Sequence, residues 1–203
     1  MSRPGKIVCV GRNYLEHAKE LGNEVPKEPL LFLKPPSSVI GMNDAIVLPA
    51  QSQQVEYEGE IGIRIAKKIF RASEAQARAA IGGVVAVNDV TARDLQKSDG
   101  QWTRAKGFDT FCPIGADAAA PNDLSSLTVV TRVNGAERQR GAASDMAFSI
   151  PMLIAYISTI MTLEPGDLVA TGTPAGVGKL SPGDVVEVEI PGLSSIRNTV
   201  AAS

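Results

Sequence analysis

Hydrophobic and polar positions along the chain predict many short strands and few helices. Residues 55–66 alternate with period two, which places apolar side chains on one face of a strand and Glu56, Glu58 and Glu60 on the other. Shorter apolar runs predict further strands. These runs are residues 6–10, 30–34, 46–48, 84–87, 168–171 and 185–190.

Helix signals occur at three places. Ser73 and Gln76 have the spacing of a capping box, which predicts a helix that ends at Gly82-Gly83. An apolar helix is expected over residues 149–161, where the serine at the start serves as N-cap. A short helix is expected over residues 14–21, because a glycine follows a run of helix-forming residues.

The pattern as a whole predicts the fold class. Residues 127–140 indicate a hairpin, because Asn134-Gly135 has the backbone freedom that a type I′ turn requires. Many strands with two or three helices indicate an α+β domain dominated by β structure. We expect residues 1–203 to form one domain, since this length suits a single hydrophobic core.

Composition and charge exclude several classes of protein. The chain is 44% hydrophobic, and its net charge of -2 comes from nearly balanced signs, which excludes a disordered chain. It has no surplus of Lys and Arg for nucleic acid and no run of about 18 apolar residues for a membrane span. Cys9 and Cys112 are too sparse for a disulfide framework, so we expect a protein of the reducing cytoplasm.

Acidic residues at two places are candidates for a metal site. Glu58 and Glu60 project in the same direction from a predicted strand, so both can bind one hard cation. Asp89 ends the apolar run 84–87, and the three acids together make an oxygen-ligand site for Mg²⁺ or Mn²⁺. Two alternatives stay open, a solvated strand face for the glutamates and an N-cap role for Asp89.

His17 is the only histidine and is the candidate base. Glu20 lies three residues on, so the two can touch on a helix, where a carboxylate raises the basicity of the imidazole for water activation. The alternative is a surface pair. By itself Lys106 is a solvated surface charge. The glycine-rich segment 171–178 fails both phosphate-loop patterns, which disfavours ATP and NAD binding.

An ordered set of motifs resembles the fumarylacetoacetate hydrolase family, most closely its acylpyruvase and oxaloacetate-decarboxylase branch. The motifs occur in the order of that family and cover nearly the whole chain. They are Cys9-Val-Gly-Arg-Asn-Tyr14 with His17 and Glu20, Leu31-Phe-Leu-Lys-Pro35, Tyr57-Glu-Gly-Glu-Ile61, Asn88-Asp-Val-Thr-Ala-Arg-Asp-Leu-Gln96, Ala105-Lys-Gly-Phe108, Phe148-Ser-Ile-Pro151 and Thr171-Gly-Thr-Pro-Ala-Gly-Val-Gly178.

The resemblance implies a fold, a cofactor and a set of site residues. The implied fold is the mixed β-roll of the C-terminal domain of that family, with a few peripheral helices, and the implied assembly is a homodimer. One Mg²⁺ or Mn²⁺ per chain is bound through Glu58, Glu60 and Asp89, and a mobile lid over about residues 12–28 carries the base. The implied catalytic residues are His17, Glu20, Gln96 and Lys106, the implied substrate contacts are Arg12, Arg93 and Thr173, and Thr110 is implied near the metal.

We therefore expect a metal-dependent hydrolase that cleaves the C–C bond of 3-acylpyruvates, such as acetylpyruvate or fumarylpyruvate, to pyruvate and a carboxylic acid. His17, held by Glu20, would activate the water, while Gln96 and Lys106 would stabilise the oxyanion. Oxaloacetate decarboxylation or 2-hydroxyhepta-2,4-diene-1,7-dioate isomerisation at the same site is the alternative, because each reaction passes its electrons to an enolate. An alternative of another class is a non-catalytic β-domain that binds a structural cation. The expected partner is a small 2-oxo or 2,4-dioxo acid, with neither nucleic acid nor membrane.

Overall fold

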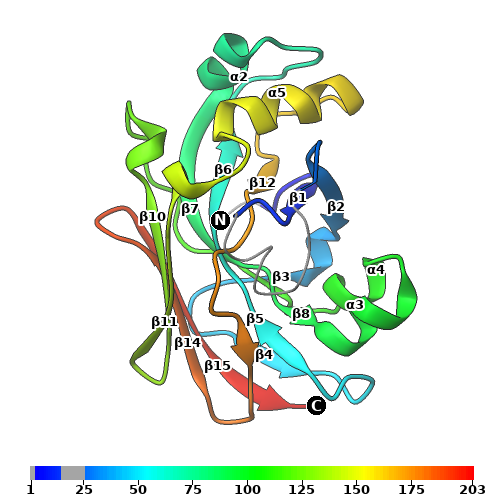
Figure 1. The fold of residues 1–203 in the computed structure, drawn as a ribbon. Coiled ribbons are helices and arrows are strands. Elements are labelled where there is room, and N and C mark those ends of the chain that lie inside the picture. The colour runs from blue at the N-terminus through cyan, green and yellow to red at the C-terminus, as the bar shows by residue number, and fades with distance from the viewer. Residues whose placement is uncertain (1–2, 15–25) are drawn as a thin grey trace.

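The computed structural model describes residues 3–14 and 26–203, and its main feature is a pair of five-stranded sheets (Figure 1). The first sheet has the spatial order β2-β1-β12-β6-β7, in which β1 and β12 run parallel and the other neighbours run antiparallel. Its strands are β1 (Ile7–Gly11), β2 (Leu30–Lys34), β6 (Gly59–Ile65), β7 (Ile81–Asn88) and β12 (Leu168–Ala170).

The second sheet has the order β11-β10-β14-β15-β4 and packs against the first, with β10 on β6 and with β14 and β15 on β7. Its strands are β4 (Ala45–Leu48), β10 (Thr128–Val133), β11 (Ala136–Ala142), β14 (Val185–Ile190) and β15 (Ser194–Ala202). A three-stranded sheet, β13-β5-β8, and a strand pair, β3-β9, lie beside them. Their bounds are β3 (Val39–Ile40), β5 (Val55–Tyr57), β8 (Thr91–Ala92), β9 (Cys112–Pro113) and β13 (Gly178–Lys179).

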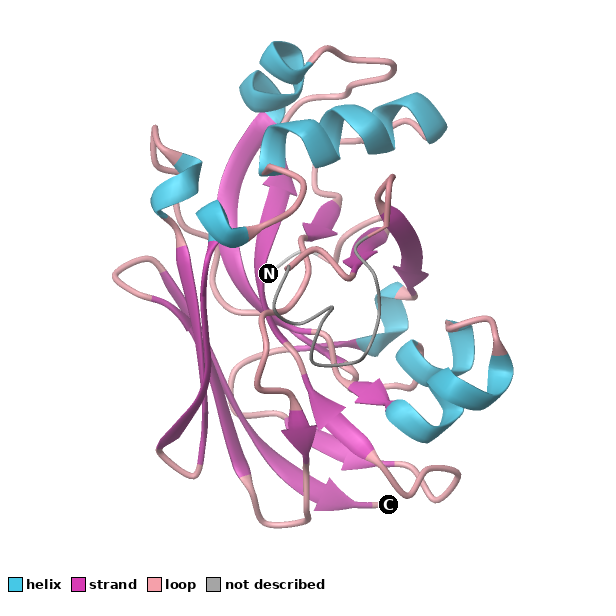
Figure 2. Cartoon of the chain, in the orientation of Figure 1, coloured by secondary structure: helices cyan, strands magenta, loops and turns pink. Residues whose placement is uncertain are grey.

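Helices flank the sheets at two places (Figure 2). The helices α2 (Glu74–Ala80) and α5 (Ile150–Ile160) pack on each other, and α3 (Arg93–Asp99) packs on α4 (Thr103–Lys106) beside β8. Both predicted N-caps are confirmed, since Ser73 and Gln76 form a full capping box and the Ser149 side chain accepts from the Met152 amide. Among the described helices, none has both the length and the apolar character needed to cross a membrane.

The main hydrophobic core lies between the two sheets and under α5. Ile61 and Val84 of the first sheet belong to the same cluster as Val188 and Ile196 of the second and Ile154 of α5, and all five are at most 1% exposed.

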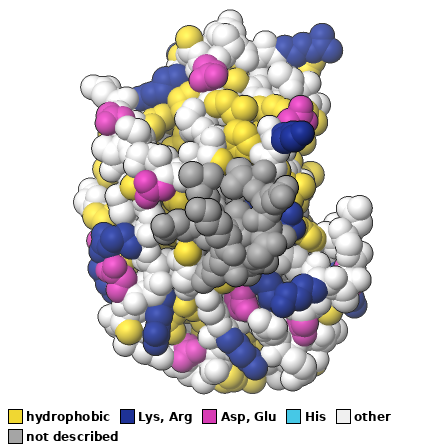
Figure 3. Space-filling view, in the orientation of Figure 1, with side chains coloured by type: hydrophobic (Ala, Val, Ile, Leu, Met, Phe, Trp, Pro, Cys, Tyr) yellow, Lys and Arg dark blue, Asp and Glu magenta, His cyan; other side chains and the backbone are white. Residues whose placement is uncertain are grey.

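On the face drawn in Figure 3, Lys and Arg are interspersed with Asp and Glu, so no large field of one sign covers it. Two five-stranded sheets with few helices confirm the β-dominated α+β fold that the sequence predicts.

Two local predictions differ from the structure. Gly82-Gly83 does not end the helix, because α2 stops at Ala80 and both glycines lie inside β7. A Cβ at Gly82 would come within 2.5 Å of the Ala66 Cβ, so the close approach of β7 to the neighbouring backbone explains why a glycine is needed there. The strand predicted over residues 55–66 is two strands, since Glu58 separates β5 from β6.

The helix predicted over residues 14–21 and most of the predicted lid lie outside the described residues. Of that helix only Tyr14 is described, and it forms an isolated bridge with Met146. The predicted hairpin is confirmed as β10 and β11, where Asn134 and Gly135 both have positive φ angles, of 53° and 78°.

Gly59 is required by packing, and we predict that Gly59→Ala destabilises the fold. A Cβ at this position would lie 1.9 Å from the Thr131 Oγ1 and 3.2 Å from Val188. Overpacking of this kind lowers the free energy of unfolding by about 3 kcal/mol, measurable by urea denaturation. Gly41→Ala is the control, because the nearest atom to its Cβ, on Asp44, is 3.6 Å away.

The double variant Gly59→Ala/Thr131→Ala separates a steric effect from a general loss of structure. Removing the hydroxyl that the new methyl group meets should recover part of the lost stability. Equal stability of Gly59→Ala and Gly41→Ala would contradict the packing argument.

Candidate active site

The strand register brings three carboxylates together. Because β6 and β7 pair antiparallel with Gly59 opposite Asn88, Glu58 and Asp89 lie opposite each other, and the Asp89 amide donates to the Glu58 carbonyl over 2.8 Å. Glu60 lies two residues after Glu58, inside β6, and one carboxylate oxygen from each of the three acids lies within 4.8 Å of the other two. The sequence prediction that these acids converge therefore agrees with the structure.

Burial decides between the alternatives that the sequence left open. Glu58, Glu60 and Asp89 are 4%, 1% and 1% exposed, so the glutamates do not lie on a solvated strand face. Asp89 is not a helix N-cap either, since the N-cap of α3 is Ala92 and makes no side-chain capping hydrogen bond. These acids are held at a cost in desolvation that something else in the site must offset.

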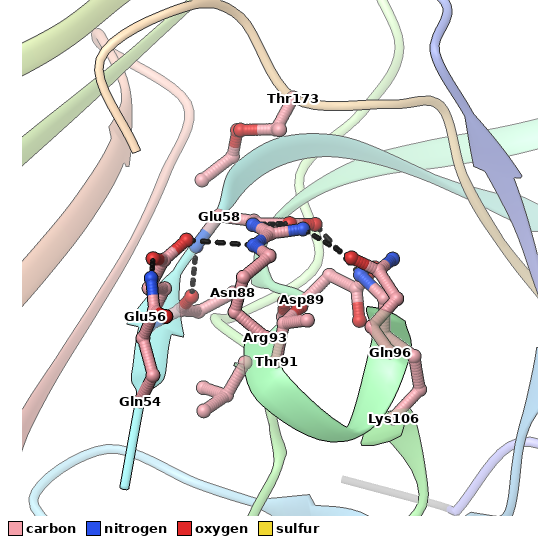
Figure 4. A network of polar contacts seen from close by, with 12 residues as sticks. Gln54, Glu56, Glu58, Asn88, Asp89, Thr91, Arg93, Gln96, Lys106 and Thr173 are labelled. Atoms are coloured by element: carbon pink, nitrogen blue, oxygen red, sulfur yellow. Dashed lines mark hydrogen bonds and ion pairs between the residues drawn. The ribbon is translucent and has the colours of Figure 1, made fainter. Parts of the chain in front are cut away.

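Three buried cations contact the carboxylates, and Figure 4 shows two of them, Arg93 and Lys106, near Glu58 and Asp89. The Lys106 Nζ lies 2.7 Å from Glu58 Oε2 and 2.6 Å from Asp89 Oδ2, so one ammonium bridges two acids. The Lys34 Nζ donates to Asp89 Oδ1 over 2.6 Å and to the Val90 carbonyl over 3.1 Å. Lys106 and Lys34 are 2% and 1% exposed, and both approach from elements outside the β6-β7 pair.

Arg93 is the third cation, and it begins α3. Its guanidinium contacts Glu58 and lies 2.7 Å from Glu56 Oε2, so it joins two acids on one strand segment. Its third contact is to the Oε1 of Gln96, one turn along the same helix. This contact turns the Gln96 Nε2 away from Arg93 and leaves its two N–H groups as donors.

The neighbouring carboxylates raise the pKa of both Glu60 and Lys106, whereas burial acts on these two groups in opposite directions. Burial raises the pKa of Glu60 well above its ordinary value, and the carboxylates of Asp89 and Glu58 raise it further. Burial alone would lower the pKa of Lys106, but the Asp89 and Glu58 carboxylates outweigh this effect and raise its pKa to about 12. Lys106 is therefore an ammonium at neutral pH, suited to donate hydrogen bonds rather than to accept a proton.

The donor set fits a hard divalent cation. Oxygens bound to Mg²⁺ lie at about 2.0–2.1 Å from the ion, so neighbouring and opposite ligand oxygens are about 3 to 4 Å apart. The three acids present oxygens within 4.8 Å of one another, which small side-chain rotations can bring to a common ion. Each carboxylate oxygen has two lone pairs, so an oxygen that accepts from a lysine can still bind a cation.

A pocket of about 350 Å³ opens above the carboxylates. One wall is apolar and includes Phe32 and Trp102, whose rings meet edge to face with centroids 5.2 Å apart. The Lys106 Nζ lies 4.9 Å from the centre of the Phe32 ring, in cation–π contact. The lining also includes charged groups, among them Glu58, Asp89 and Arg93. Pockets of this size with a few convergent polar groups bind small molecules.

The structure brings most of the predicted site residues to this pocket. Its lining includes the three acids together with Arg12, Arg93, Gln96, Lys106 and Thr173. Thr110 does not line it, and its hydroxyl instead accepts from the Val47 amide of β4 over 2.9 Å. His17 and Glu20 lie outside the described residues.

Sequence reasoning did not select three buried polar residues of the site, of which Lys34 and Glu56 belong to the charged network. Lys34 ends an apolar strand, and Glu56 is 6% exposed and held by Arg93 and by the Gln54 amide. The third is Gln139 of β11, which is 1% exposed and bonds to both Gly59 and Thr173. Lys34 lies inside a motif of the family resemblance, and the signal for Glu56 was its place on the polar face of the predicted strand, beside Glu58 and Glu60.

The model of the family described as "Fumarylacetoacetate (FAA) hydrolase C-terminal" matches residues 6–201 of this chain. The chain belongs to this family. The match covers all of the described strands and helices that form the pocket, and the three buried acids fit the divalent metal that enzymes of this family typically use.

Relatives and solved structures of the family carry related names. The chain is 46% identical to a protein of Arabidopsis thaliana named oxaloacetate tautomerase FAHD1, mitochondrial, over 95% of this chain and 89% of that protein. It is 44% identical to oxaloacetate decarboxylase, mitochondrial, of Dictyostelium discoideum, over 94% and 90%. The crystal structure of 2-hydroxyhepta-2,4-diene-1,7-dioate isomerase from Mycobacterium marinum is similar with a TM-score of 0.91 and 44% identity, over 99% of this chain and 76% of that one.

We predict that Lys34→Met destabilises the protein and that Mg²⁺ restores part of the loss. Removing one partner of a buried ion pair leaves the charge on Asp89 balanced only in part, by Lys106, which costs about 3 to 5 kcal/mol of unfolding free energy. A divalent cation bound by the native state offsets this charge, so the loss should shrink when Mg²⁺ is added.

Lys68→Met is the matched control, because Lys68 pairs with Glu164 over 2.8 Å but its side chain is 68% exposed. It should change the unfolding free energy by less than about 1 kcal/mol. Equal effects of the two substitutions in urea denaturation would contradict the role given to Lys34.

Proposed function

We propose that this protein is a divalent-cation-dependent enzyme that acts on oxaloacetate, and that it interconverts the keto and enol forms of this 2-oxo diacid. The observation that carries the proposal is the trio of buried acids, Glu58, Glu60 and Asp89, in the lining of a pocket where the protonated Lys106 bridges Glu58 and Asp89. A structural cation site would not require an adjoining pocket with a lysine and a glutamine among its donors.

Charge favours a substrate with two carboxylates. Four basic residues line the pocket, and Lys34 adjoins them, while Glu56 joins the three acids. The result is five positive charges against four negative ones, and a bound divalent cation would leave an excess of three positive charges. A dianion such as oxaloacetate offsets more of this excess than a monoanion such as acetylpyruvate. The basic lining residues are Arg12, Arg93, Lys97 and Lys106.

The side chains of the pocket supply binding, orientation and charge. Lys106 stays protonated and can donate to an oxygen that becomes negative as the enol forms. Gln96 accepts from Arg93 and so presents its N–H groups as further donors. Phe32 and Trp102 form an apolar wall against which a planar enol can lie, and this wall limits the access of water.

Tautomerisation requires a proton to leave C3 of the substrate. The electron pair of the C3–H bond forms the C2–C3 double bond, while the carbonyl pair moves onto the C2 oxygen, which then takes a proton. When bound, the divalent cation supplies Lewis-acid stabilisation of negative charge on the substrate oxygens. Lys106 cannot accept the C3 proton in its charged form, so we assign that role to His17 with Glu20, which remains a prediction from the sequence.

The names of the relatives support oxaloacetate as the substrate. One relative is named a tautomerase and another a decarboxylase of this compound. Decarboxylation would use the same binding mode, because loss of the distal carboxylate also leaves negative charge on the C2 oxygen. Decarboxylation removes no proton from C3 and needs no base. Measuring it beside tautomerisation therefore distinguishes the role of His17 from that of the three acids.

Hydrolysis of 3-acylpyruvates is the second candidate. The pair His17 and Glu20, with the spacing that activates a water molecule, favours it. The same donors, Gln96 and Lys106, would then stabilise the tetrahedral oxyanion.

The homodimer, the single domain and the cytoplasmic location stay predictions from the sequence.

We predict that Glu60→Gln lowers kcat/KM for oxaloacetate by more than about 100-fold, because a carboxylate ligand is lost. His17→Ala should abolish tautomerisation and hydrolysis but leave metal-dependent decarboxylation within about threefold. The measurement is a side-by-side assay of enol-oxaloacetate, keto-oxaloacetate, acetylpyruvate and fumarylpyruvate, with Mn²⁺ or with EDTA.

Each outcome of this assay identifies one reaction. Faster turnover of fumarylpyruvate or acetylpyruvate than of oxaloacetate would replace the proposed activity by the hydrolase. Turnover that is indifferent to EDTA, or full activity of Glu60→Gln, would contradict a metal-dependent enzyme. The exposed Glu74→Gln is the control for the loss of a carboxylate as such.

A further inference from the structure

Gln139 lies in the second sheet, yet its amide reaches the backbone between two of the candidate metal ligands. Gln139 Oε1 accepts from the amide of Gly59 over 3.0 Å, and Gly59 is flanked by Glu58 and Glu60. Gln139 Nε2 donates over 2.8 Å both to Thr173 Oγ1 and to the carbonyl of Pro174. These partners fix the orientation of the amide, since the oxygen meets a donor and the nitrogen meets two acceptors.

Thr173 closes a ring of hydrogen bonds. Its hydroxyl donates to the Gly59 carbonyl over 2.9 Å while it accepts from Gln139. Both backbone groups of Gly59 are therefore held by two side chains that are bonded to each other. The single proton of the Thr173 hydroxyl is committed to Gly59, so within this ring Thr173 can only accept from a bound substrate.

The hydrogen bonds from Gln139 and Thr173 serve Gly59 in place of the bonds that a neighbouring strand would supply. β12 pairs with β6 only as far as Gly62, and beyond it the Thr171 amide and hydroxyl bond to the Ile61 carbonyl. At Gly59 the edge of β6 has no strand beside it among the described residues, and buried backbone groups left without partners are costly. Gln139 and Thr173 supply these partners, and in doing so they fix the segment from which Glu58 and Glu60 project.

The surrounding packing holds Gln139 in place. The segment 171–178 lies directly on β11, because a Cβ at Gly176 would be 2.1 Å from the Arg138 carbonyl and one at Gly141 would be 2.5 Å from Pro174. A side chain cannot be added at either contact without moving the segment away from Gln139. The ring is therefore buried, with Gln139 1% and Thr173 4% exposed.

We propose that Gln139 is a positioning residue, which through Thr173 and Gly59 fixes both the spacing of Glu58 and Glu60 for the divalent cation and the place of the 171–178 segment at the substrate pocket. Gln139 itself does not line the pocket, its printed hydrogen bonds go to no candidate ligand side chain, and it reaches the pocket lining through Thr173. Its effect on substrate rests on the proposed function, whereas its effect on cation affinity does not.

The test is the affinity for Mn²⁺ of purified full-length protein, measured by calorimetry, with the unfolding midpoint recorded alongside. Gln139→Met keeps the length of the side chain and removes all three hydrogen bonds, and it should raise the Kd for Mn²⁺ about tenfold, as loss of the supports of metal ligands does. Gln51→Met, at an exposed glutamine, should leave the Kd within twofold of wild type.

A double-mutant cycle distinguishes positioning from a general structural role. Thr173→Val opens the same ring from its other side, so Gln139→Met/Thr173→Val should bind Mn²⁺ no more than twofold more weakly than the weaker single variant. Multiplied effects of the two changes, or a wild-type Kd in Gln139→Met despite a lowered unfolding midpoint, would overturn the proposal.

Two further outcomes are informative. If Gln139→Met does not fold, Thr173→Val decides alone, and a wild-type Kd in that variant overturns the proposal. If no 2-oxo acid is turned over by the wild type, the proposed function fails, while the Mn²⁺ affinities still test Gln139. Where turnover is present, the loss in Gln139→Met should be recovered in part by saturating Mn²⁺, which a defect confined to catalysis would not show.

Discussion

The burial of like charges at one end of the β6-β7 pair is the constraint on which the rest of the site depends. Glu58, Glu60 and Asp89 are almost completely removed from water, and carboxylates held so close repel one another strongly in a low dielectric. The chain offsets part of this cost with Lys34, Arg93 and Lys106, which come from β2, α3 and α4. Burial and the carboxylates of Asp89 and Glu58 raise the pKa of Glu60, so the charged form of Glu60 is the one that a bound divalent cation would stabilise most.

This arrangement explains how so many elements come together around one pocket. Lys34 belongs to the first third of the chain and Lys106 to the middle. Lys34 nevertheless donates to one oxygen of the Asp89 carboxylate and Lys106 donates to the other. The segment 171–178 adds a backbone donor, because the Gly172 amide bonds to Glu60 Oε2 over 2.8 Å. These ion pairs and hydrogen bonds to the carboxylates therefore connect the ends of β2, β7, α4 and β12.

The sequence predicted the elements whose signals are local. The capping box at Ser73, the turn at Asn134-Gly135 and the alternation of residues 55–66 depend only on neighbours in sequence, and each describes what the structure shows apart from the break at Glu58. The end of α2 was predicted wrongly because Gly82 serves the packing of β7 against Ala66, a contact that no local pattern reveals.

The convergence of the candidate site was predictable in part. Period two placed Glu58 and Glu60 on one side of a strand, but the approach of Asp89 follows from the β6-β7 register. Burial of Lys34 and Gln139 could not be predicted, because each sits in a stretch that reads as an ordinary strand until distant elements cover it. Polar residues of this kind are identified only once the tertiary contacts that satisfy them are known.

Calorimetric titration of the purified wild-type protein with Mn²⁺ shows whether the three buried acids bind a divalent cation. We expect saturable binding of one ion per chain, lost in Glu60→Gln and unchanged in a variant of the exposed Glu74. Absence of saturable binding, or a Glu60→Gln protein that binds as tightly as wild type, would contradict this expectation.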